Sequence, residues 1–537
     1  MKPHLAYYTW ADRLASELAK KGAKKHVLHG MWTPSGYFHI GNARNELLIQ
    51  SLIYRALEDK EIKADFNFLM DDFDDFDKVP DGLGIAKEEF DEHLGKPLRE
   101  VPSPSGDQSW AEYFEEDLIS YIENFTIKPN YMKTYDEYKK GSYNDSIKIA
   151  LDNSTRINEI WTKIAGKQRE GLPITIICEN CGKTATTESL AWNGSTVRYS
   201  CTKERKYTKG CNHSGEVSPF DGKAKLPWRV HWPATWYINK TTFEPAGKDH
   251  FTKGGSVDTG RAFAREIFKI EPPLSTVGEF IQIHGAKISG SVGNVITLGS
   301  WIEFAEPELL RFMMISYQPQ TAINFDMDSN KLSLLIDRYE TAEKVFFGKE
   351  KFDNEKKNIQ LKREYFLSQI NKVPEKIPLR VPFHMAVMIA GLYGHSREIL
   401  ETSIELLKNT GHIEGKITNK DKERIDESLQ RAKNWIEKYN PEMKLKVNDK
   451  VSEDMIESLT VSQKKAIKEL AIYLFTQRKY EDLYAKLYET AKSNGLSSQE
   501  FFQGCYKVLI GKDAGPRLAH FILVIGQDRA RRIFEQV

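Results

Sequence analysis

Four of the five cysteines of the chain lie close together, as Cys178-x2-Cys181 followed by Cys201 and Cys211. Four thiolates at such spacings can form the tetrahedral shell of a zinc ion. The alternatives are an accidental CxxC spacing, a redox pair, and a zinc shell in which His213 replaces Cys211. Because four protein ligands leave no open coordination position, we expect a structural zinc rather than a catalytic one.

Residues 34–42, with the sequence PSGYFHIGN, lie where an expected strand is followed by an expected helix. The first turn of a helix offers free backbone N–H groups and the positive end of the helix dipole, which suits a phosphate. His39 can donate to a phosphate oxygen, Gly41 leaves room for a flat purine against the backbone, and Asn42 can cap the helix. Taken alone, the motif is also compatible with a plain glycine-rich turn.

A second loop of small residues, residues 285–294, follows an expected strand that ends at His284 and contains the sequence KISGS. On such a loop Lys287 can move toward a polyphosphate, and the hydroxyls of Ser289 and Ser291 can follow it. A solvated surface loop is the alternative for this motif alone. The two loops together, on the two halves of one sheet, indicate a nucleotide site.

Hydrophobic periodicity places the first loop in a βαβ unit. Residues 26–31 form an apolar run, apolar side chains recur at three- and four-residue spacings from Asn42 onward, and residues 64–70 are apolar and aromatic. A strand, a helix of about 16 residues and a second strand in this order predict a parallel sheet.

The rest of the chain divides by composition. Residues 172–222 are rich in Gly, Thr and Lys and are typical of an insertion, whereas residues 227–297 return to strand and glycine-loop character, with an alternating strand at 279–284. From about Lys331 the sequence is helical throughout. Residues 349–376 are rich in charge, and we expect them to form a partly exposed connection.

Composition narrows the class of protein. The chain has 537 residues, of which 40% are hydrophobic and 28% charged, enough for several cores and about three or four domains. Its 77 Lys and Arg against 76 Asp and Glu exclude a polybasic tail but not a basic face. We find no secretory signal and no apolar run of about 18 residues. Five cysteines are too few for a disulfide scaffold, so we expect a cytoplasmic protein, with Cys505 in a helical core.

In these motifs the chain resembles the class I aminoacyl-tRNA synthetases, whose HIGH and KMSKS signatures occupy the places of the two loops. More narrowly, it resembles the archaeal-type class I lysyl-tRNA synthetases, and the resemblance covers essentially the whole chain. The segments that carry the narrower resemblance are residues 39–46, 71–74, 244–250, 254–260 and 509–517.

The chain departs from the family pattern at several positions. Gly290 stands where the general class has the second lysine of its KMSKS element, and Val292 follows, so Lys287 is the only lysine of the motif. His231 and Thr235 stand where an aspartate and an arginine are usual in the family. We therefore assign no role to His231 or Thr235.

The resemblance implies a Rossmann-type parallel-sheet catalytic domain with a zinc-bearing insertion, followed by an all-α C-terminal region that binds tRNA and its anticodon. We expect the first half of the catalytic domain, the insertion, the second half, a helical tRNA-binding subdomain and an anticodon-binding subdomain at residues 1–95, 96–226, 227–330, 331–450 and 451–537.

The implied reaction has two steps in one site. ATP, accompanied by Mg²⁺, activates the carboxylate of L-lysine with release of pyrophosphate, and the 3′ end of tRNA(Lys) then takes the lysyl group. No covalent nucleophile is needed, because positioning and charge stabilisation on the polyphosphate suffice. The expected partners are tRNA(Lys), lysine and ATP, with no membrane partner, and the expected cofactors are ATP, Mg²⁺ and structural Zn²⁺. We expect a monomer.

The resemblance also assigns roles to residues of the motifs. Catalysis would fall to His39, Asn42, Lys287, Ser289 and Ser291. ATP would be bound by Pro34, Ser35, Gly36, His39, Gly41, Asn42, Asp258 and Lys287. The lysine substrate would be bound by Gly30, Thr33, Asp71, Asp72, Trp236, Asp249 and His250.

Two of these assignments have simple alternatives. Residues 71–77 are an acidic run after a strand, and such a run is often a solvated loop. If Asp71 or Asp72 lies beyond the carboxyl end of a parallel strand, its carboxylate faces the ligand crevice and suits the ε-ammonium of lysine. Trp236 is alternatively an ordinary core aromatic.

Two other classes of function remain. A non-catalytic tRNA-binding paralogue would be favoured by loss of His39 or Lys287, and both are present. A class I synthetase for another amino acid is the second alternative. A cysteine enzyme would need an open zinc, whereas four ligands close this shell, and a glutamate enzyme would need a basic pocket, whereas the run at 71–77 is acidic.

Overall fold

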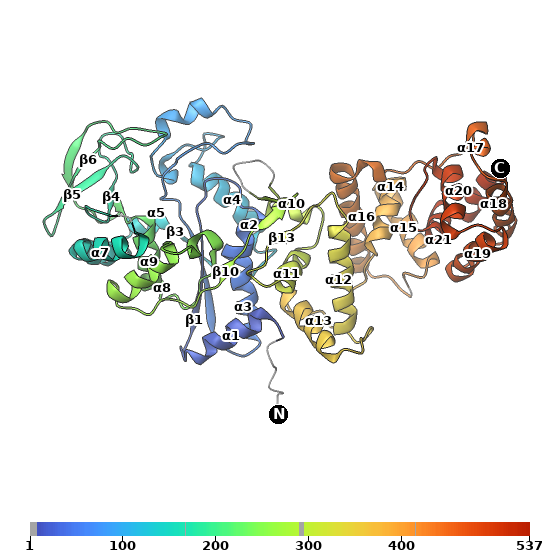
Figure 1. Cartoon of the computed structure of the whole chain (residues 1–537), viewed down its shortest axis with the longest axis horizontal. Coiled ribbons are helices and arrows are strands. Elements are labelled where there is room, and N and C mark those ends of the chain that lie inside the picture. The colour runs from blue at the N-terminus through green and yellow to red at the C-terminus, as the bar shows by residue number, and fades with distance from the viewer. Residues whose placement is uncertain (1–7, 167, 289–294, 414) are drawn as a thin grey trace. The chain divides into compact units, whose positions relative to one another are not determined.

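The computed structural model describes residues 8–166, 168–288, 295–413 and 415–537, and the chain folds into two compact units (Figure 1). The first unit comprises Met1–Trp301, Glu306–Asp326 and Asp337–Val373. The second comprises Ile302–Ala305, Met327–Ile336 and Pro374–Val537. Ser289, Gly290, Ser291 and Val292 of the second motif lie outside the described residues.

The first unit is built on the predicted parallel sheet. Strand β1 (His26–Trp32) pairs in parallel with β2 (Ala64–Met70), and β2 pairs in parallel with β3 (Asn130–Lys133). Strands β1 and β2 are mostly buried, and five of the seven residues in each are not polar. On the far edge of β1, Leu28 forms a parallel bridge with Phe243, which forms another with Leu274, so the two halves of the domain share one sheet.

The helix between β1 and β2 is continuous but not uniform. It begins as α2 (Ile40–Asn42), continues as a π-helix (Ala43–Leu48), and ends as α3 (Ile49–Glu58). The π-helical turns were not predicted from the sequence. They pack closely on β1, since a Cβ on Gly30 would lie 2.0 Å from the carbonyl oxygen of Glu46, and only glycine fits there.

Arg44, in the π-helix, ties this helix to the second half of the domain. The residue is 2% exposed, and its guanidinium donates at 2.7–3.3 Å to the carbonyl oxygens of Glu279, Phe280, Gln318, Pro319 and Thr321. The first two of these carbonyls precede β11 (Ile281–Ile283), and the other three precede β13 (Ile323–Asn324). Strand β11 pairs with β13 and with β12 (Ala286–Lys287). The buried arginine therefore fixes the base of the loop that carries Lys287.

The predicted insertion has its own small sheet. Strands β5 (Glu188–Trp192), β6 (Val197–Ser200) and β7 (Ser214–Val217) are antiparallel, and β4 (Thr175–Ile176) pairs with β8 (Ala224–Lys225) where the chain enters and leaves. Helices precede it: α4 (Trp110–Ile122), α5 (Thr134–Lys139), α6 (Asn144–Asp152) and α7 (Ser154–Ala165).

After the insertion the chain completes the catalytic half of the unit with α8 (Trp228–Asn239), β9 (Ala246–Gly247), α9 (Ser256–Glu266) and β10 (Val277–Gly278). An apolar core packs α8 and α9 against the ends of β1 and β2, with Met31, Leu69, Trp232, Trp236 and Val257 as buried members. This core supports the carboxyl edge of the sheet.

Helices α10 (Leu298–Ile302), α11 (Pro307–Ser316) and α12 (Lys331–Phe346) follow. Residues 349–376 are partly exposed, as expected, but they are not a simple connection, because they contain α13 (Glu355–Ser368). Leu361, Tyr365 and Leu367 of α13 are buried, and the buried Arg311 donates to the Leu367 and Ser368 carbonyls at 3.0 and 2.9 Å. The charges occupy the other face of a packed amphipathic helix.

The second unit is helical, as predicted for the C-terminal region, and is drawn mainly in orange to red in Figure 1. Its helices are α14 (Phe383–Tyr393), α15 (Arg397–Asn409), α16 (Asn419–Tyr439), α17 (Glu453–Glu457), α18 (Val461–Tyr473), α19 (Tyr480–Ser493), α20 (Ser498–Ile510), α21 (Leu518–Ile525) and α22 (Gln527–Phe534). No helix in the described part of the chain is both long and apolar enough to cross a membrane. The five predicted segment boundaries stay a prediction, and the two compact units divide the chain differently.

Candidate active site

A cavity of about 550 Å³ lies at the carboxyl end of β1, where ligands bind in parallel α/β sheets. We call it the active-site cavity. It is lined by Met31, Trp32, Thr33, Ser35, Gly36, Tyr37, His39, Asn42, Glu46, Asp74, Asp77, Lys78, Pro80, Trp228 and His250. Six residues assigned to the site from the sequence are among them: Thr33, Ser35, Gly36, His39, Asn42 and His250.

His39 is held in one tautomer by the helix that it caps. Its Nδ1 accepts from the backbone N–H groups of Gly41 and Asn42 at 3.1 and 3.2 Å, and its own backbone N–H donates to the Asn42 side chain at 3.3 Å. Burial, with a smaller effect of the Lys287 charge, lowers the pKa of His39 to about 4. The imidazole is therefore neutral at pH 7, with its proton on Nε2 as a hydrogen-bond donor.

Gly41 is required by this cap. A Cβ at this position would lie 3.0 Å from the imidazole of His39, closer than side chains normally approach. The same Cβ would lie 3.9 Å from Ile288, in the second motif. The glycine thus lets His39 fold back onto the start of the helix.

The structure brings the two motifs together. His39 forms an antiparallel bridge with Thr297, and the Ile40 N–H donates to the Ile296 carbonyl at 2.9 Å. Before the undescribed residues, Lys287 is half exposed, with its Nζ 3.1 Å from Asp249 Oδ2 and 3.7 Å from the Phe280 ring centroid. The ammonium is thus held loosely, near the His39 imidazole whose pKa it lowers.

Glu46 is a cavity residue that the sequence did not reveal as a site residue. Burial and the nearby Glu244 raise its pKa to about 8, although the Met31 N–H donates to it. Glu244 is buried too, but it accepts from Trp236 Nε1 at 2.5 Å and contacts His29 Nδ1 at 3.0 Å. The signal was its position four residues after Asn42, which places both on one helix face.

An aromatic wall closes one side of the cavity. Trp228, Trp232 and Trp236 follow one another at four-residue spacing on α8, and the rings of Trp228 and Trp232 stack at 5.2 Å. The His250 ring lies 5.7 and 5.6 Å from those two rings. Trp228 and His250 line the cavity, whereas Trp236 lies behind them and is 3% exposed. Trp236 therefore supports the wall from the core.

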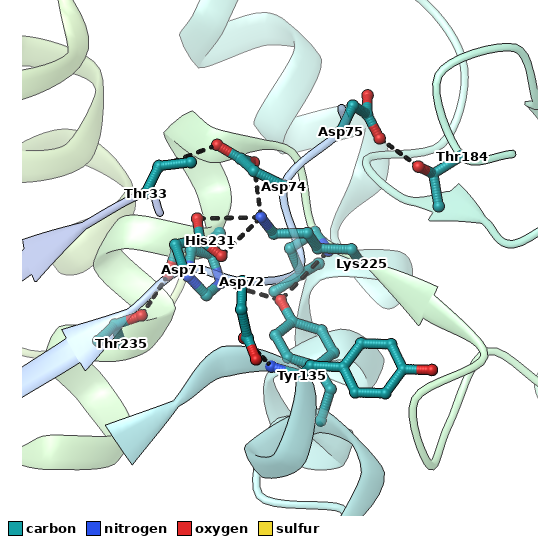
Figure 2. Close-up of polar contacts among 12 residues, drawn as sticks. Thr33, Asp71, Asp72, Asp74, Asp75, Tyr135, Thr184, Lys225, His231 and Thr235 are labelled. Carbon is teal, nitrogen blue, oxygen red and sulfur yellow. Dashed lines mark hydrogen bonds and ion pairs between the residues drawn. The ribbon is translucent and has the colours of Figure 1, made fainter. Parts of the chain in front are cut away.

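The acidic run after β2 contains both buried and more exposed carboxylates. Figure 2 shows their polar contacts. Both oxygens of Asp71 accept from the buried Lys225 ammonium at 2.8 and 3.0 Å, and Asp74 accepts from it at 2.6 Å. Asp72 accepts from the Tyr135 N–H at 2.7 Å. Asp71 and Asp72 are fully buried, so the acids of this run that line the cavity are Asp74 and Asp77, not the pair expected from the sequence.

The physical reason is an extension of strand pairing. The Asp71 N–H donates to the Trp32 carbonyl at 2.8 Å, which continues the β1–β2 pairing one residue past the strand. The Asp71 and Asp72 side chains therefore remain inside the sheet edge. The chain turns outward only after them, where Asp74 accepts from the Thr33 hydroxyl at 3.3 Å.

The two departures from the family pattern, His231 and Thr235, are core residues. Both are fully buried on α8. His231 Nδ1 contacts the Tyr138 hydroxyl at 2.9 Å, and the Thr235 hydroxyl contacts that of Tyr143 at 2.8 Å. Burial lowers the pKa of His231 well below its usual value, so it is a neutral packing residue.

The other residues assigned from the sequence lie outside the cavity lining. Asp258 accepts from the Gly254 N–H at 3.0 Å, and Asp249 contacts Lys287. Within the described chain, the assigned residues that do not line the cavity are Gly30, Pro34, Gly41, Asp71, Asp72, Trp236, Asp249, Asp258 and Lys287.

The four clustered cysteines meet in the insertion. The Sγ atoms of Cys178 and Cys211 are 3.6 Å apart, those of Cys181 and Cys201 are 3.7 Å apart, and all four lie within 4.8 Å of one another. This geometry is compatible with a tetrahedral zinc shell. His213 is not part of the group.

Comparison with known families agrees with this geometry. The family described as class I tRNA synthetases (K) matches residues 8–371, which is more than half of the chain. The chain belongs to this family.

Full-length relatives narrow the comparison. The lysine–tRNA ligase of Methanocaldococcus jannaschii is 34% identical over 533 residues, covering 97% of this chain and 98% of the relative. The lysine–tRNA ligase of Pyrococcus horikoshii is 35% identical over 535 residues, covering 96% of both. Among solved structures, a glutamate tRNA ligase from Elizabethkingia meningosepticum matches with a TM-score of 0.41 and 12% identity over 96% of this chain and 99% of the other.

Proposed function

We propose that the chain is a lysine–tRNA ligase, which activates L-lysine with ATP and transfers the lysyl group to the 3′ end of tRNA(Lys) in protein biosynthesis. The observation that carries the proposal is the Glu46 carboxylate, which lines a cavity beside the His39 cap and has no cation of its own in the described structure. The full-length similarity to lysine–tRNA ligases supports it.

Glu46 receives the ε-ammonium of the substrate. A carboxylate with a pKa of about 8 is costly to ionise in the empty cavity, and an ammonium bound beside it repays that cost. Asp71 and Asp72 are less suited to this role, because their carboxylates already have buried partners. Thr33 and His250 line the pocket around the lysine, while Gly30, Trp236 and Asp249 support it.

ATP lies along the start of the α2 helix. The His39 Nε2–H donates to a phosphate oxygen, and Ser35, Gly36 and Asn42 line the same part of the cavity. Mg²⁺ accompanies the phosphates and neutralises part of their charge. Lys287 moves from Asp249 to the pyrophosphate as charge builds on it. Pro34, Gly41, Asp258, Ser289 and Ser291 complete the proposed nucleotide site.

Cys178, Cys181, Cys201 and Cys211 hold one structural zinc. Their four sulfurs close the shell, so this ion takes no part in the reaction. The helical second unit binds tRNA(Lys), including its anticodon, and the working form is a cytosolic monomer without a membrane partner.

The test is ATP–pyrophosphate exchange with each of the twenty amino acids, with and without cognate tRNA. Lysine should be the amino acid that gives exchange, with tRNA present if activation requires it. If another amino acid is activated and lysine is not, the specificity is wrong. If none is activated but tRNA binds, the chain is a non-catalytic tRNA-binding protein.

A further inference from the structure

The helical second unit contains a cavity of about 560 Å³ whose lining is dominated by aromatic rings. We call it the aromatic cavity, and its rings are those of Tyr480, Tyr484, Tyr488, Phe502 and Tyr506. Its volume is in the range of small-ligand sites, roughly 300–1,000 Å³. Its rim is formed by Gly515, Pro516 and Arg517. These residues belong to the 509–517 motif, which does not contribute to the active-site cavity.

Three of the tyrosines form a row along one helix because of their spacing in the sequence. Tyr480, Tyr484 and Tyr488 follow at four-residue intervals on α19, so they lie on one helix face. Successive rings are 5.8 and 4.9 Å apart, and the Phe502 ring lies 5.6 Å from that of Tyr488. Tyr484 and Tyr488 are 47% and 40% exposed, so their rings are not used by the protein core.

The cavity is also held in shape. The Tyr480 ring stacks on the buried His520 at 4.2 Å, and the Tyr506 hydroxyl donates to the Pro516 carbonyl. A Cβ on Gly515 would lie 2.7 Å from the Tyr506 ring, so the motif must carry glycine for the rim to pack on that ring. The Tyr480 and Tyr506 rings at the two sides of the cavity are therefore fixed before a ligand binds, which lowers the entropy cost of binding.

A cation stands at the rim. Arg517 is exposed, and its guanidinium has no hydrogen bond or ion pair within the described residues. The acidic residue of the same loop, Asp513, is 3.6 Å from Lys507. Exposed rings beside an unpaired arginine are the two elements by which proteins hold single-stranded RNA, with bases on the rings and phosphates on the cation.

We propose that the aromatic cavity takes one unpaired nucleobase from a loop of the tRNA, stacked on Tyr484 and Tyr488, with a backbone phosphate on Arg517. The proposal rests on the proposed function insofar as that function supplies the RNA. Because every base has a π face, the rings provide affinity and not sequence discrimination.

The experiment measures binding of a tRNA(Lys) transcript to the full chain. Tyr484→Ala and Tyr488→Ala should each weaken binding by about 5- to 150-fold, the range measured for loss of one stacked base, whereas Tyr484→Phe should bind normally. Arg517→Ala should weaken binding and reduce the slope of log binding constant against log salt concentration by about one, as expected for loss of one phosphate contact. Arg517→Lys should retain that contact. Phe475→Ala is the matched control, since Phe475 is 65% exposed in the same unit but outside the cavity.

A second readout locates the base. Transcripts carrying 2-aminopurine at single loop positions should show quenching at one position on binding, and the quenching should disappear with Tyr484→Ala. Normal affinity for Tyr484→Ala and Tyr488→Ala, an equal loss for Phe475→Ala, or quenching that survives the substitutions would each overturn the proposal.

Failure of this proposal can be distinguished from failure of the proposed function. With saturating tRNA, the Tyr484 variants should activate lysine at the normal kcat and show only a raised KM for tRNA. If lysine is not activated by the wild type but the base is quenched in a Tyr484-dependent way, the enzyme assignment fails and the cavity stands. If lysine is activated and the substitutions leave tRNA binding unchanged, the enzyme assignment stands and the proposal for the aromatic cavity fails.

Discussion

The active-site cavity and the aromatic cavity have almost the same volume, about 550 and 560 Å³, but they are built differently. In the first, polar groups are fixed by buried hydrogen bonds, such as those that hold His39 in one tautomer. In the second, the lining includes the exposed rings of Tyr484 and Tyr488. The active-site cavity can therefore stabilise a developing charge, whereas the aromatic cavity can only add affinity. Substitutions should therefore change rates in one cavity and binding in the other.

The largest effect should come from Lys287→Ala. A lysine that reaches the pyrophosphate as it leaves lowers the barrier, and loss of one such contact costs about 3–4 kcal/mol, a few hundred-fold in rate. We expect adenylate formation in single turnover, with tRNA present, to slow by roughly two orders of magnitude or more, with little change in the KM for ATP.

Lys248→Ala is the control for this substitution, because Lys248 is a half-exposed lysine paired with Glu279. A normal rate for Lys287→Ala, or a defect confined to the KM for ATP, would show that the loop does not stabilise the transition state. Ser289→Ala should have a smaller effect, because a neutral hydroxyl makes a weaker hydrogen bond than an ammonium.

His39 offers a sharper test, because its two nitrogens have separate tasks. His39→Asn keeps an acceptor at the position of Nδ1 and loses the Nε2–H donor, so it should fold normally and activate lysine about 10- to 100-fold more slowly. His39→Gln keeps a donor at the position of Nε2 and should be faster than His39→Asn.

The pH profile adds to this test. Because the pKa of His39 is lowered to about 4, the imidazole is neutral above about pH 5 and should cause no titration of the rate there. Below that range protonation of Nδ1 breaks both cap bonds. Equal rates for the two His39 variants, or a His39-dependent inflection near neutral pH, would contradict the assignment.

Glu46→Gln should affect lysine binding more than the chemical step. Loss of a carboxylate–ammonium contact should raise the KM for lysine about ten-fold or more. In the wild type, the free carboxyl is mostly protonated below its pKa of about 8, and only the ionised form attracts the ammonium. Lysine affinity should therefore rise about five-fold from pH 7 to pH 8, where the substrate ammonium is still charged. Calorimetry that finds the same slope in Glu46→Gln would exclude Glu46 as its source.

The smallest effect on activation should follow loss of the zinc. We expect one zinc per chain, and Cys178→Ser should lower the metal content and expose the insertion to proteolysis while the second unit stays folded. His213→Ala should keep its metal, because its ring is not part of the four-sulfur group. Elemental analysis of the wild type without zinc would remove the proposal.

The sequence predicted those features that depend on local pattern. The two buried strands, the helix between them, the helical second unit and the meeting of four cysteines are all present, because periodicity and Cys spacing report them directly. The likeness of the motifs to class I synthetases also led to six residues of the active-site cavity.

The features that the sequence did not predict depend on tertiary contacts. Whether Asp71 or Asp74 reaches the cavity depends on strand pairing that continues one residue beyond β2. The spacing of Glu46 from Asn42 indicated a shared helix face, but its burial beside Glu244, which raises its pKa, exists only in the folded domain. Helix α13 has a charged face that resembles a connection until its packing within the first unit is known.

Lys225, where the chain leaves the insertion, limits how the insertion can be removed or exchanged. Because β4 and β8 bring residues 175 and 225 together, the insertion has the form of a cassette that could be excised or grafted between relatives. Excision would remove Lys225 and leave Asp71 and Asp74 without their shared cation, at a cost of about 3–5 kcal/mol for a broken buried ion pair. Asp74 also holds Thr33 at the cavity. A viable graft must therefore carry a lysine at the same place, whatever becomes of the metal.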